Sequence, residues 1–286
     1  MHIQADAGCP ACYICAPLEG KDPVQQKWNA EDYAKNSAAQ LQWAQELIAK
    51  LVFKGCESVL DIGCGDGKIS ARLALAAKNG NVLGIDLSED MIRLASKQFP
   101  SAKYPNLSFL RMDATGIRLS ERFDVAFSNA ALHWVKNHIA VLRGVHACLK
   151  SGGKILFQMG GRGNAAEVFG AIEKVLLHPR WRRYYEDFTP PYHFYGPEEY
   201  EAWLLKSGFR PVRVDLLPKD MQHHGTQRFK GWLRTTWFPY TDRLPVELRD
   251  AFLAEVVDTY TAANPFDALG HIHVKMVRLE VEAYAL

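Results

Sequence analysis

A glycine-rich turn is the first feature of this sequence that suggests chemistry. Residues 59–67 read VLDIGCGDG, so an apolar run passes into glycines at alternate positions, Gly63, Gly65 and Gly67. Glycine lets the backbone turn tightly and lets a ligand approach without a Cβ in the way. In an open parallel sheet, ligands bind in the crevice beyond the carboxyl ends of the strands. The turn therefore predicts a ligand-binding loop.

The spacing of these glycines distinguishes between ligands. A dinucleotide fingerprint needs a small residue three places after Gly65, and this chain has Lys68 there. A Walker-type phosphate loop is excluded too, because no lysine followed by serine or threonine closes the turn. The pattern is instead G-x-G-x-G, with Asp61 two residues before the first glycine. A nicotinamide-dependent oxidoreductase is therefore disfavoured.

Two acidic residues follow apolar runs at corresponding places further along the chain. Asp86 closes the run at residues 81–86, and Asp113 follows the run at 107–112. A carboxylate at Asp86 can accept both hydroxyls of a ribose, as it does in dinucleotide folds, and one at Asp113 can accept from an adenine amine. Each aspartate alone is as readily explained as a helix cap or a solvated residue. Three such features in register at successive strand ends favour a nucleoside site.

Apolar runs that alternate with amphipathic stretches must position these residues. Strands are predicted at residues 58–62, 81–86, 107–112, 123–129 and 154–158, and helices at 32–53, 69–78, 88–99 and 138–149. Strands and helices that alternate at this spacing imply βαβ units and a parallel sheet with helices on both faces. After residue 159 the pattern becomes irregular and rich in aromatic residues, before a helix at 198–206 and strands at 210–216 and 271–284.

The glycine turn with Asp61, the acidic Asp86 and the Asp113–Ala114 pair resemble the conserved motifs of class I S-adenosylmethionine-dependent methyltransferases. The resemblance covers about residues 28–160 well and the remainder in outline. It implies an α/β fold with a doubly wound, mostly parallel seven-stranded sheet, and S-adenosylmethionine as the cofactor. The positions that it assigns to the cofactor are Tyr33, Asp61, Gly63, Gly65, Gly67, Asp86, Leu87, Asp113, Ala114 and Asn129.

Composition and periodicity along the chain, together with this resemblance, suggest a division of the chain. Residues 1–24 are expected to form a flexible, cysteine-containing tail and residues 25–159 the cofactor-binding core. Residues 160–196 and 218–270 are predicted to form a helical, aromatic-rich cap, whereas 197–217 and 271–286 complete the sheet.

The loop after the fourth predicted strand bears on the methyl acceptor. It ends in Leu132-His133-Trp134 and lacks the Asn/Asp-Pro-Pro-aromatic pattern of many amino-group methyltransferases. Together with Trp28 and Gln40 it resembles the trans-aconitate and juvenile-hormone-acid methyltransferases, which esterify small carboxylic acids. The resemblance implies that Gln40 and Trp134 hold the acceptor carboxylate, and His133 is a further catalytic candidate.

The expected acceptor chemistry agrees with the lack of an obvious general base. A carboxylic acid is already ionised at neutral pH, so no base has to remove a proton. Two other hypotheses stay open: methyl transfer to nitrogen or carbon, and a regulatory protein that binds the cofactor without turnover. Structural roles are also open, with Trp134 as a core aromatic, His133 as a structural hydrogen-bonding group and Gln40 as a solvated side chain.

Composition limits the partners. The chain has 286 residues, 48% hydrophobic, and a net charge of +2, which is too small to suggest a nucleic-acid partner. No run of 18 apolar residues and no secretory signal are evident, so no membrane span and a cytoplasmic location are expected. The expected partner is a small-molecule acceptor, with an apolar surface suggested by the aromatic cap. The sequence leaves the oligomeric state open.

Three cysteines near the N-terminus have a spacing that can wrap a soft metal. Cys9, Cys12 and Cys15 follow a C-x-x-C-x-x-C pattern. Three thiolates still need a fourth ligand, and no cysteine or histidine follows nearby to complete a zinc site. No metal site is therefore predicted, and an unstructured or redox-active tail is favoured.

Overall fold

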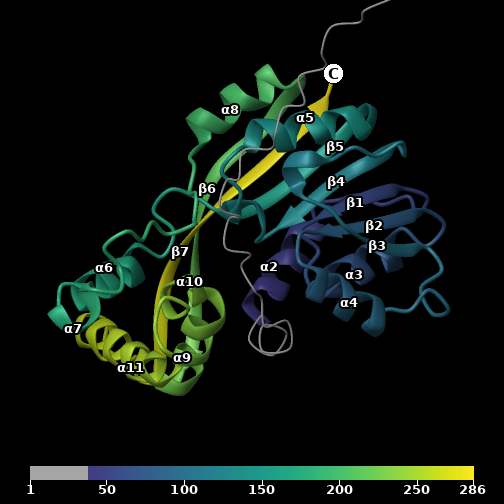
Figure 1. Cartoon of the computed structure of the whole chain (residues 1–286). Coiled ribbons are helices and arrows are strands. Elements are labelled where there is room, and N and C mark those ends of the chain that lie inside the picture. Colours follow the sequence, from purple (N-terminus) through teal and green to yellow (C-terminus); the bar gives the residue numbers. More distant parts are fainter. Residues whose placement is uncertain (1–37) are drawn as a thin grey trace, which may run out of the picture.

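Short apolar runs become the parallel strands of one sheet in a computed structural model that describes residues 38–286 (Figure 1). The strands are β1 Ser58–Ile62, β2 Asn81–Asp86, β3 Leu107–Arg111, β4 Phe123–Asn129, β5 Leu149–Gly160, β6 Phe209–His224 and β7 His271–Ala285. They lie in the order β3-β2-β1-β4-β5-β7-β6, with β7 antiparallel to both of its neighbours. This confirms the doubly wound, mostly parallel seven-stranded sheet expected from the sequence.

Helices cover both faces of the sheet because successive side chains of a strand point to opposite sides. On one face lie α2 Ala38–Ile48, α3 Lys68–Ala76 and α4 Glu89–Gln98, and on the other lie α5 His138–Cys148 and α8 Pro197–Lys206 (Figure 1). Within β1, Val59 packs in the cluster that includes α2 and α3, whereas Leu60 and Ile62 pack in the cluster that includes α5 and α8. Each side thus has a buried apolar core.

Five further helices form the aromatic-rich cap. They are α6 Ala166–Leu176, α7 Pro179–Arg182, α9 Gly225–Thr236, α10 Phe238–Thr241 and α11 Val246–Ala263. The cap packs on a two-stranded extension of β6 and β7 that projects past the rest of the sheet (Figure 1). Buried residues of this extension, including Met221, Ile272 and Val274, share one apolar cluster with the cap helices.

The extension was only partly predicted, because β6 continues past the expected end at Leu216 to His224. Pro218 makes the continuation of β6 hard to predict from the sequence, because proline cannot donate a hydrogen bond to a sheet ladder. It is tolerated here because β6 is the outermost strand next to β7, and edge strands accommodate proline. The expected cap segment after residue 217 therefore begins as a strand.

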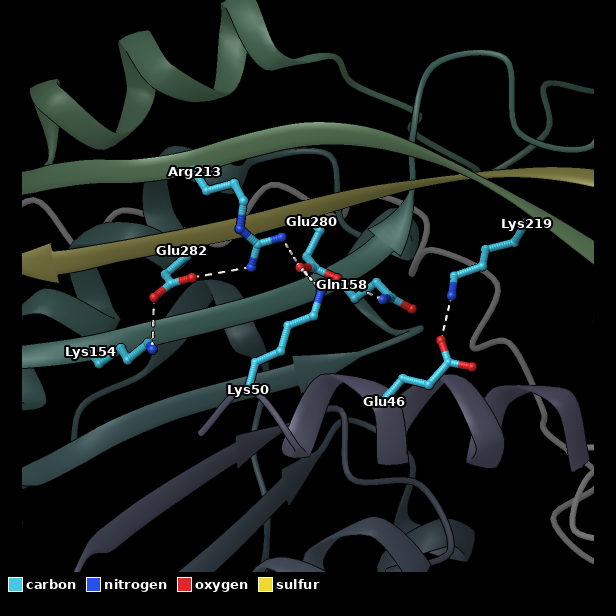
Figure 2. A network of polar contacts seen from close by, with 8 residues as sticks. All are labelled: Glu46, Lys50, Lys154, Gln158, Arg213, Lys219, Glu280 and Glu282. Carbon is cyan, nitrogen blue, oxygen red and sulfur yellow. Dashed lines mark hydrogen bonds and ion pairs between the residues drawn. The ribbon is translucent and has the colours of Figure 1, made fainter. Parts of the chain in front are cut away.

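A buried polar network fastens α2 to the sheet (Figure 2). The Glu280 carboxylate on β7 is only 1% exposed and accepts hydrogen bonds from Lys50 in the turn after α2 (2.5 Å), Gln158 on β5 (3.1 Å) and Arg213 on β6. Burial raises the pKa of Glu280, but these hydrogen bonds outweigh it and hold the pKa below its ordinary value. Next to it, Glu282 pairs with Arg213 and Lys154.

Candidate active site

A cavity lies beyond the carboxyl ends of β1, β2 and β4, where the strand order reverses between β1 and β4. Such a reversal is where open α/β sheets bind their ligands. The predicted residues that line this cavity, termed here the cofactor cavity, are Gly63, Gly65, Asp86, Leu87, Asp113, Ala114, Asn129 and Trp134. Sequence positions up to 71 residues apart, from Gly63 to Trp134, are thus brought to one place.

Gly63 and Gly65 of the glycine turn are suited to their positions for different reasons. Gly63 has φ +71°, and a Cβ there would lie 2.1 Å from the Cβ of Ala131, so the chain itself excludes a side chain. Gly65 has φ +54° and no heavy atom within 4 Å of a hypothetical Cβ. Its backbone therefore borders open space within the cavity, as expected where a ligand approaches closely.

The Asp86 carboxylate is held in place by backbone donors. Gly65 N–H donates to one carboxylate oxygen (3.0 Å) and Ser88 N–H to the other (2.8 Å). Burial raises the pKa of Asp86, although the two backbone hydrogen bonds oppose the shift. A fixed, desolvated carboxylate of this kind favours added donors, such as the two hydroxyls of a ribose.

Asp113 is both a cap and a lining residue. Its carboxylate accepts from the Thr115 backbone N–H (2.8 Å) and hydroxyl (2.9 Å), which caps the short 3₁₀ helix η1, Ala114–Gly116. It also borders the cofactor cavity, beside the apolar side chains of Leu87 and Met112. The structural and functional interpretations of this aspartate are therefore compatible.

Asp61 does not line the cavity, although the resemblance assigned it to the cofactor. Its side chain is 2% exposed and accepts a hydrogen bond from the Ser70 hydroxyl at the start of α3 (2.6 Å). Burial, opposed by this bond and assisted by the charge of Asp86, raises the pKa of Asp61 to about 7. Gly67 is not among the lining residues either, and a Cβ there would meet the Phe109 ring at 2.8 Å.

Two other predicted residues fall where the structure gives no side-chain detail. Tyr33 lies outside the described residues, and Gln40 is placed on the first turn of α2 without its side chain being described. Their assigned roles stay predictions.

A second cavity lies between the loop after β4 and the cap, and is termed the cap cavity. Its lining residues are Trp43, Ala130, His133, Trp134, Asn164, Tyr192, Phe194, Met221, Trp232, Thr236, Trp237, Met276 and Arg278. Ala130 and Trp134 also line the cofactor cavity, so the two cavities are neighbours. Ala130 has φ 57°, a conformation uncommon outside glycine, and donates its N–H to the Gln158 carbonyl (2.8 Å). The turn at Ala130 therefore lies where the two cavities meet.

His133 is placed to act as a hydrogen-bond donor. Burial, with the nearby charge of Arg278, lowers the pKa of His133 well below its ordinary value, so the ring is neutral at physiological pH. Its Nδ1 accepts the Gly160 backbone N–H at 3.4 Å. A neutral imidazole that accepts at Nδ1 carries its proton on Nε2. His133 thus offers an N–H to its surroundings and no free lone pair.

Comparisons with known proteins agree with this architecture. Residues 59–153 match the methyltransferase domain family. An uncharacterised methyltransferase of Schizosaccharomyces pombe is 33% identical over 73% of this chain and 86% of its own length. The chain belongs to the class I S-adenosylmethionine-dependent methyltransferases. The trans-aconitate 2-methyltransferase of Variovorax paradoxus is 29% identical over 83% of this methyltransferase and 90% of its own length.

Solved structures share the fold. A putative methyltransferase from Bacillus halodurans superposes with a TM-score of 0.58 at 18% identity, covering 84% of this methyltransferase and 97% of that chain. Phosphoethanolamine N-methyltransferase 2 of Haemonchus contortus, solved with S-adenosylmethionine, has a TM-score of 0.54 at 19% identity. The match covers 90% of this methyltransferase and 56% of that chain. S-adenosylmethionine is the cofactor of this methyltransferase.

The residues of the cofactor cavity fit this cofactor. Open space above Gly65 leaves room for the methionine portion, and the buried Asp86 carboxylate suits ribose hydroxyls. Leu87 and Met112 supply apolar walls beside Asp113, a combination suited to a purine ring. We propose that these residues hold S-adenosylmethionine, with Asp61 supporting the turn from beneath.

Several lining residues of the cap cavity were not singled out from the sequence, and Arg278 is the clearest case. In β7, the alternate positions Ile272, Val274 and Met276 are buried and apolar, and the same face continues with Arg278 and Glu280. Charged residues at inward positions of an alternating strand are the signal that could have revealed it. The indoles of Trp232 and Trp237 gave no local signal, because a helix of ordinary composition, α9, carries the first and is followed directly by the second.

Neither a membrane-spanning helix nor a metal site is found in the part of the chain that the structure describes. Within residues 38–286 no helix is long and apolar enough to cross a membrane. In the same range no group of three or more histidine, cysteine, aspartate or glutamate side chains is placed to hold a metal ion. Cys9, Cys12 and Cys15 lie outside the described residues, so the interpretation of that tail stays a prediction.

Binding of S-adenosylmethionine should strengthen as pH rises from 6 to 8. Because the pKa of Asp61 is raised to about 7, the free protein is partly protonated there at neutral pH. The cofactor carries net positive charge and favours the ionised carboxylate, so binding releases a proton. The dissociation constant should fall by up to about tenfold per pH unit below the raised pKa, the limit for one proton. Calorimetry across this pH range measures the slope.

The matched variants are Asp61→Asn, which should flatten the pH dependence, and Asp113→Asn, which should retain it. A wild-type affinity that does not change between pH 6 and 8 would contradict the coupling.

Proposed function

We propose that this methyltransferase transfers the methyl group to a carboxylate oxygen of a small molecule and releases a methyl ester. The observation that carries the proposal is the state of His133, whose Nδ1 accepts from Gly160 and whose pKa is depressed by burial. No carboxylate or lysine is present among the described residues that line the cap cavity. A carboxylic acid suits such a cavity as acceptor, because its pKa lies well below neutral pH and no group has to remove its proton.

S-adenosylmethionine supplies an electrophilic methyl group on a sulfonium when bound. Trp134 borders both cavities and is positioned to orient the acceptor toward the cofactor cavity. The aromatic walls of the cap cavity exclude water, which disfavours separated charges and favours the less charged transition state. Alignment at near-attack distance can contribute about 7–11 kcal/mol of the barrier reduction. His133 Nε2–H and, by prediction, Gln40 add neutral donors for the carboxylate.

The curated relatives support this acceptor type. Several are trans-aconitate 2-methyltransferases, and trans-aconitate is a carboxylic acid. The fold alone does not discriminate, since the N-methyltransferase of Haemonchus contortus shares it. An amine or carbon acceptor would need a group to remove its proton, and the described lining residues offer none with a free lone pair of suitable pKa.

Methyl-labelled S-adenosylmethionine and a panel of small acids should yield a product that releases methanol in mild alkali. Trp134→Phe should lower kcat/KM for the acid by about 10- to 100-fold, because a donor to a charged acceptor contributes about 1.5–3 kcal/mol. Trp203→Phe on α8, outside both cavities, is the control and should behave as wild type. An alkali-stable methylated product would favour nitrogen or carbon transfer and overturn the proposal.

A further inference from the structure

The cap cavity is walled by aromatic rings that contact one another. The ring centroid of Tyr192 lies 4.7 Å from that of Trp134 and 5.0 Å from that of Trp237. The Tyr192 ring is also nearly parallel to the Phe194 ring, with the two centroids 6.0 Å apart. The thioethers of Met221 and Met276 complete the lining. Aromatic faces and edges attract another π-system more specifically than they attract a saturated body, and methionine sulfur adds favourable contacts to rings. The wall therefore favours a flat, conjugated ligand.

Two buried indole N–H groups in this wall have no acceptor within residues 38–286. Trp232 and Trp237 are 2% and 3% exposed, and neither indole N–H has a hydrogen-bond acceptor among the described residues. The Tyr192 hydroxyl, in contrast, donates to the Thr236 carbonyl at 3.0 Å. A buried indole N–H usually finds a partner, so two without one at the same cavity point to ligand oxygen atoms.

The charge of the lining limits the charge of the ligand. Arg278 is the one formally charged side chain among the described lining residues, and it is 3% exposed. Its guanidinium lies over the Trp43 ring, 5.4 Å from the centroid, and its charge contributes to the lowered pKa of His133. One cation in an aromatic wall suits one anionic group. A ligand with three carboxylates would bury negative charges against apolar rings, which is costly.

We propose that the cap cavity binds a flat, conjugated monocarboxylic acid as the methyl acceptor. Its body packs among the rings of Tyr192, Phe194 and Trp237, and its acid group is drawn in by Arg278 at the end of the cavity that holds His133 and Trp134. The proposal rests on the proposed function and names the substrate class. It separates this methyltransferase from its trans-aconitate relatives by acceptor shape and charge.

Arg278 is expected to act mainly on binding of the acceptor. Its attraction to the carboxylate is strongest before transfer and weakens as the carboxylate loses its charge, so it stabilises the bound acid more than the transition state. Arg278→Met should therefore raise KM for the acid by about tenfold or more, the cost of one charged contact, with a smaller change in kcat. Arg278→Lys, which keeps the charge, should recover part of the loss.

The test uses the full chain and three acids: trans-cinnamate, 3-cyclohexylpropanoate and trans-aconitate. The first two share carbon count and charge and differ in planarity and conjugation. Calorimetry on protein loaded with S-adenosylhomocysteine measures binding without turnover, and ester formation with S-adenosylmethionine measures kcat and KM. Trans-cinnamate should bind at least about tenfold more tightly than 3-cyclohexylpropanoate, consistent with one or two aromatic contacts, and trans-aconitate should bind more weakly than both.

Trp237→Leu should narrow the difference between trans-cinnamate and 3-cyclohexylpropanoate. Equal binding of these two acids, a preference for trans-aconitate, or no binding of any of the three overturns the inference. Ester formation with trans-aconitate preferred would leave the proposed function intact and reject this substrate class. Tight, Arg278-dependent binding of trans-cinnamate with an alkali-stable methylated product would support the site and reject ester formation.

Discussion

Asp86→Ala should weaken binding of S-adenosylmethionine by about 100-fold or more. In the wild type, the buried Asp86 carboxylate is fixed by the N–H groups of Gly65 and Ser88 and is proposed to accept both ribose hydroxyls. Hydrogen bonds to a charged acceptor contribute about 1.5–3 kcal/mol each, so the loss of two exceeds a hundredfold. The alanine variant also frees the glycine turn from its anchor. Calorimetric titration with the cofactor and with its demethylated product gives the ratio directly.

Two variants make this result specific. Asp86→Asn keeps the shape of the side chain but places an NH₂ against one of the two backbone donors, so it should lose most of the affinity as well. Asp113→Asn alters an exposed cap at the rim of the cavity and should cost less. Wild-type affinity in Asp86→Ala, with the melting temperature unchanged, would move the nucleoside site away from β2.

Glu280→Gln should lower the free energy of unfolding by about 3 kcal/mol at pH 7. The substitution keeps the size of the side chain and leaves Lys50 and Arg213 without the buried carboxylate that they share (Figure 2). Removing one partner from a buried ion pair typically costs 3–5 kcal/mol, and the partial exposure of Lys50 places this network at the lower end. Urea denaturation measures the loss.

The pH dependence of this effect has a definite sign. The hydrogen bonds hold the pKa of Glu280 below its ordinary value of 4.5, so the stabilisation is complete above that value and is lost as pH falls through the lowered one. The difference between wild type and Glu280→Gln should therefore persist at pH 5 and shrink below pH 4.5. Glu46→Gln, which breaks the more exposed pair with Lys219, should cost less than about 1 kcal/mol. Equal losses in both variants would contradict the role of burial.

The cofactor half of this protein was predictable because its signals are local. Gly63, Gly65 and Asp86 sit at strand ends, and parallel strands bring their carboxyl ends to one edge whatever the packing elsewhere. Asp61 shows that a residue in the same motif can nevertheless face away from the cavity. It shares a strand face with Val59, two residues earlier, and that face packs against α3 and away from the cavity. Strict alternation along β1 would have predicted its position.

The cap cavity was not predictable in the same way. Trp43 comes from α2, Trp134 from the loop after β4, Trp237 from the turn between α9 and α10, and Arg278 from β7. No spacing rule connects these positions, because the cap brings them together by packing on the extended strands. The expectation of an apolar, aromatic cap followed from composition alone, and the position of its one buried cation required the register of β6 against β7.

The two excursions that build the cap leave the sheet and rejoin it at adjacent points. Gly161 forms a bridge with Tyr195, and His224 pairs with His271 at the far end of the β6–β7 extension. An insertion whose ends touch can lengthen, shorten or be replaced without moving the strands that carry it. The cap, with its proposed acceptor site, can therefore change during evolution while the cofactor cavity stays under constraint. For the same reason, residues 162–194 and 225–270 are natural exchange units for chimeric enzymes.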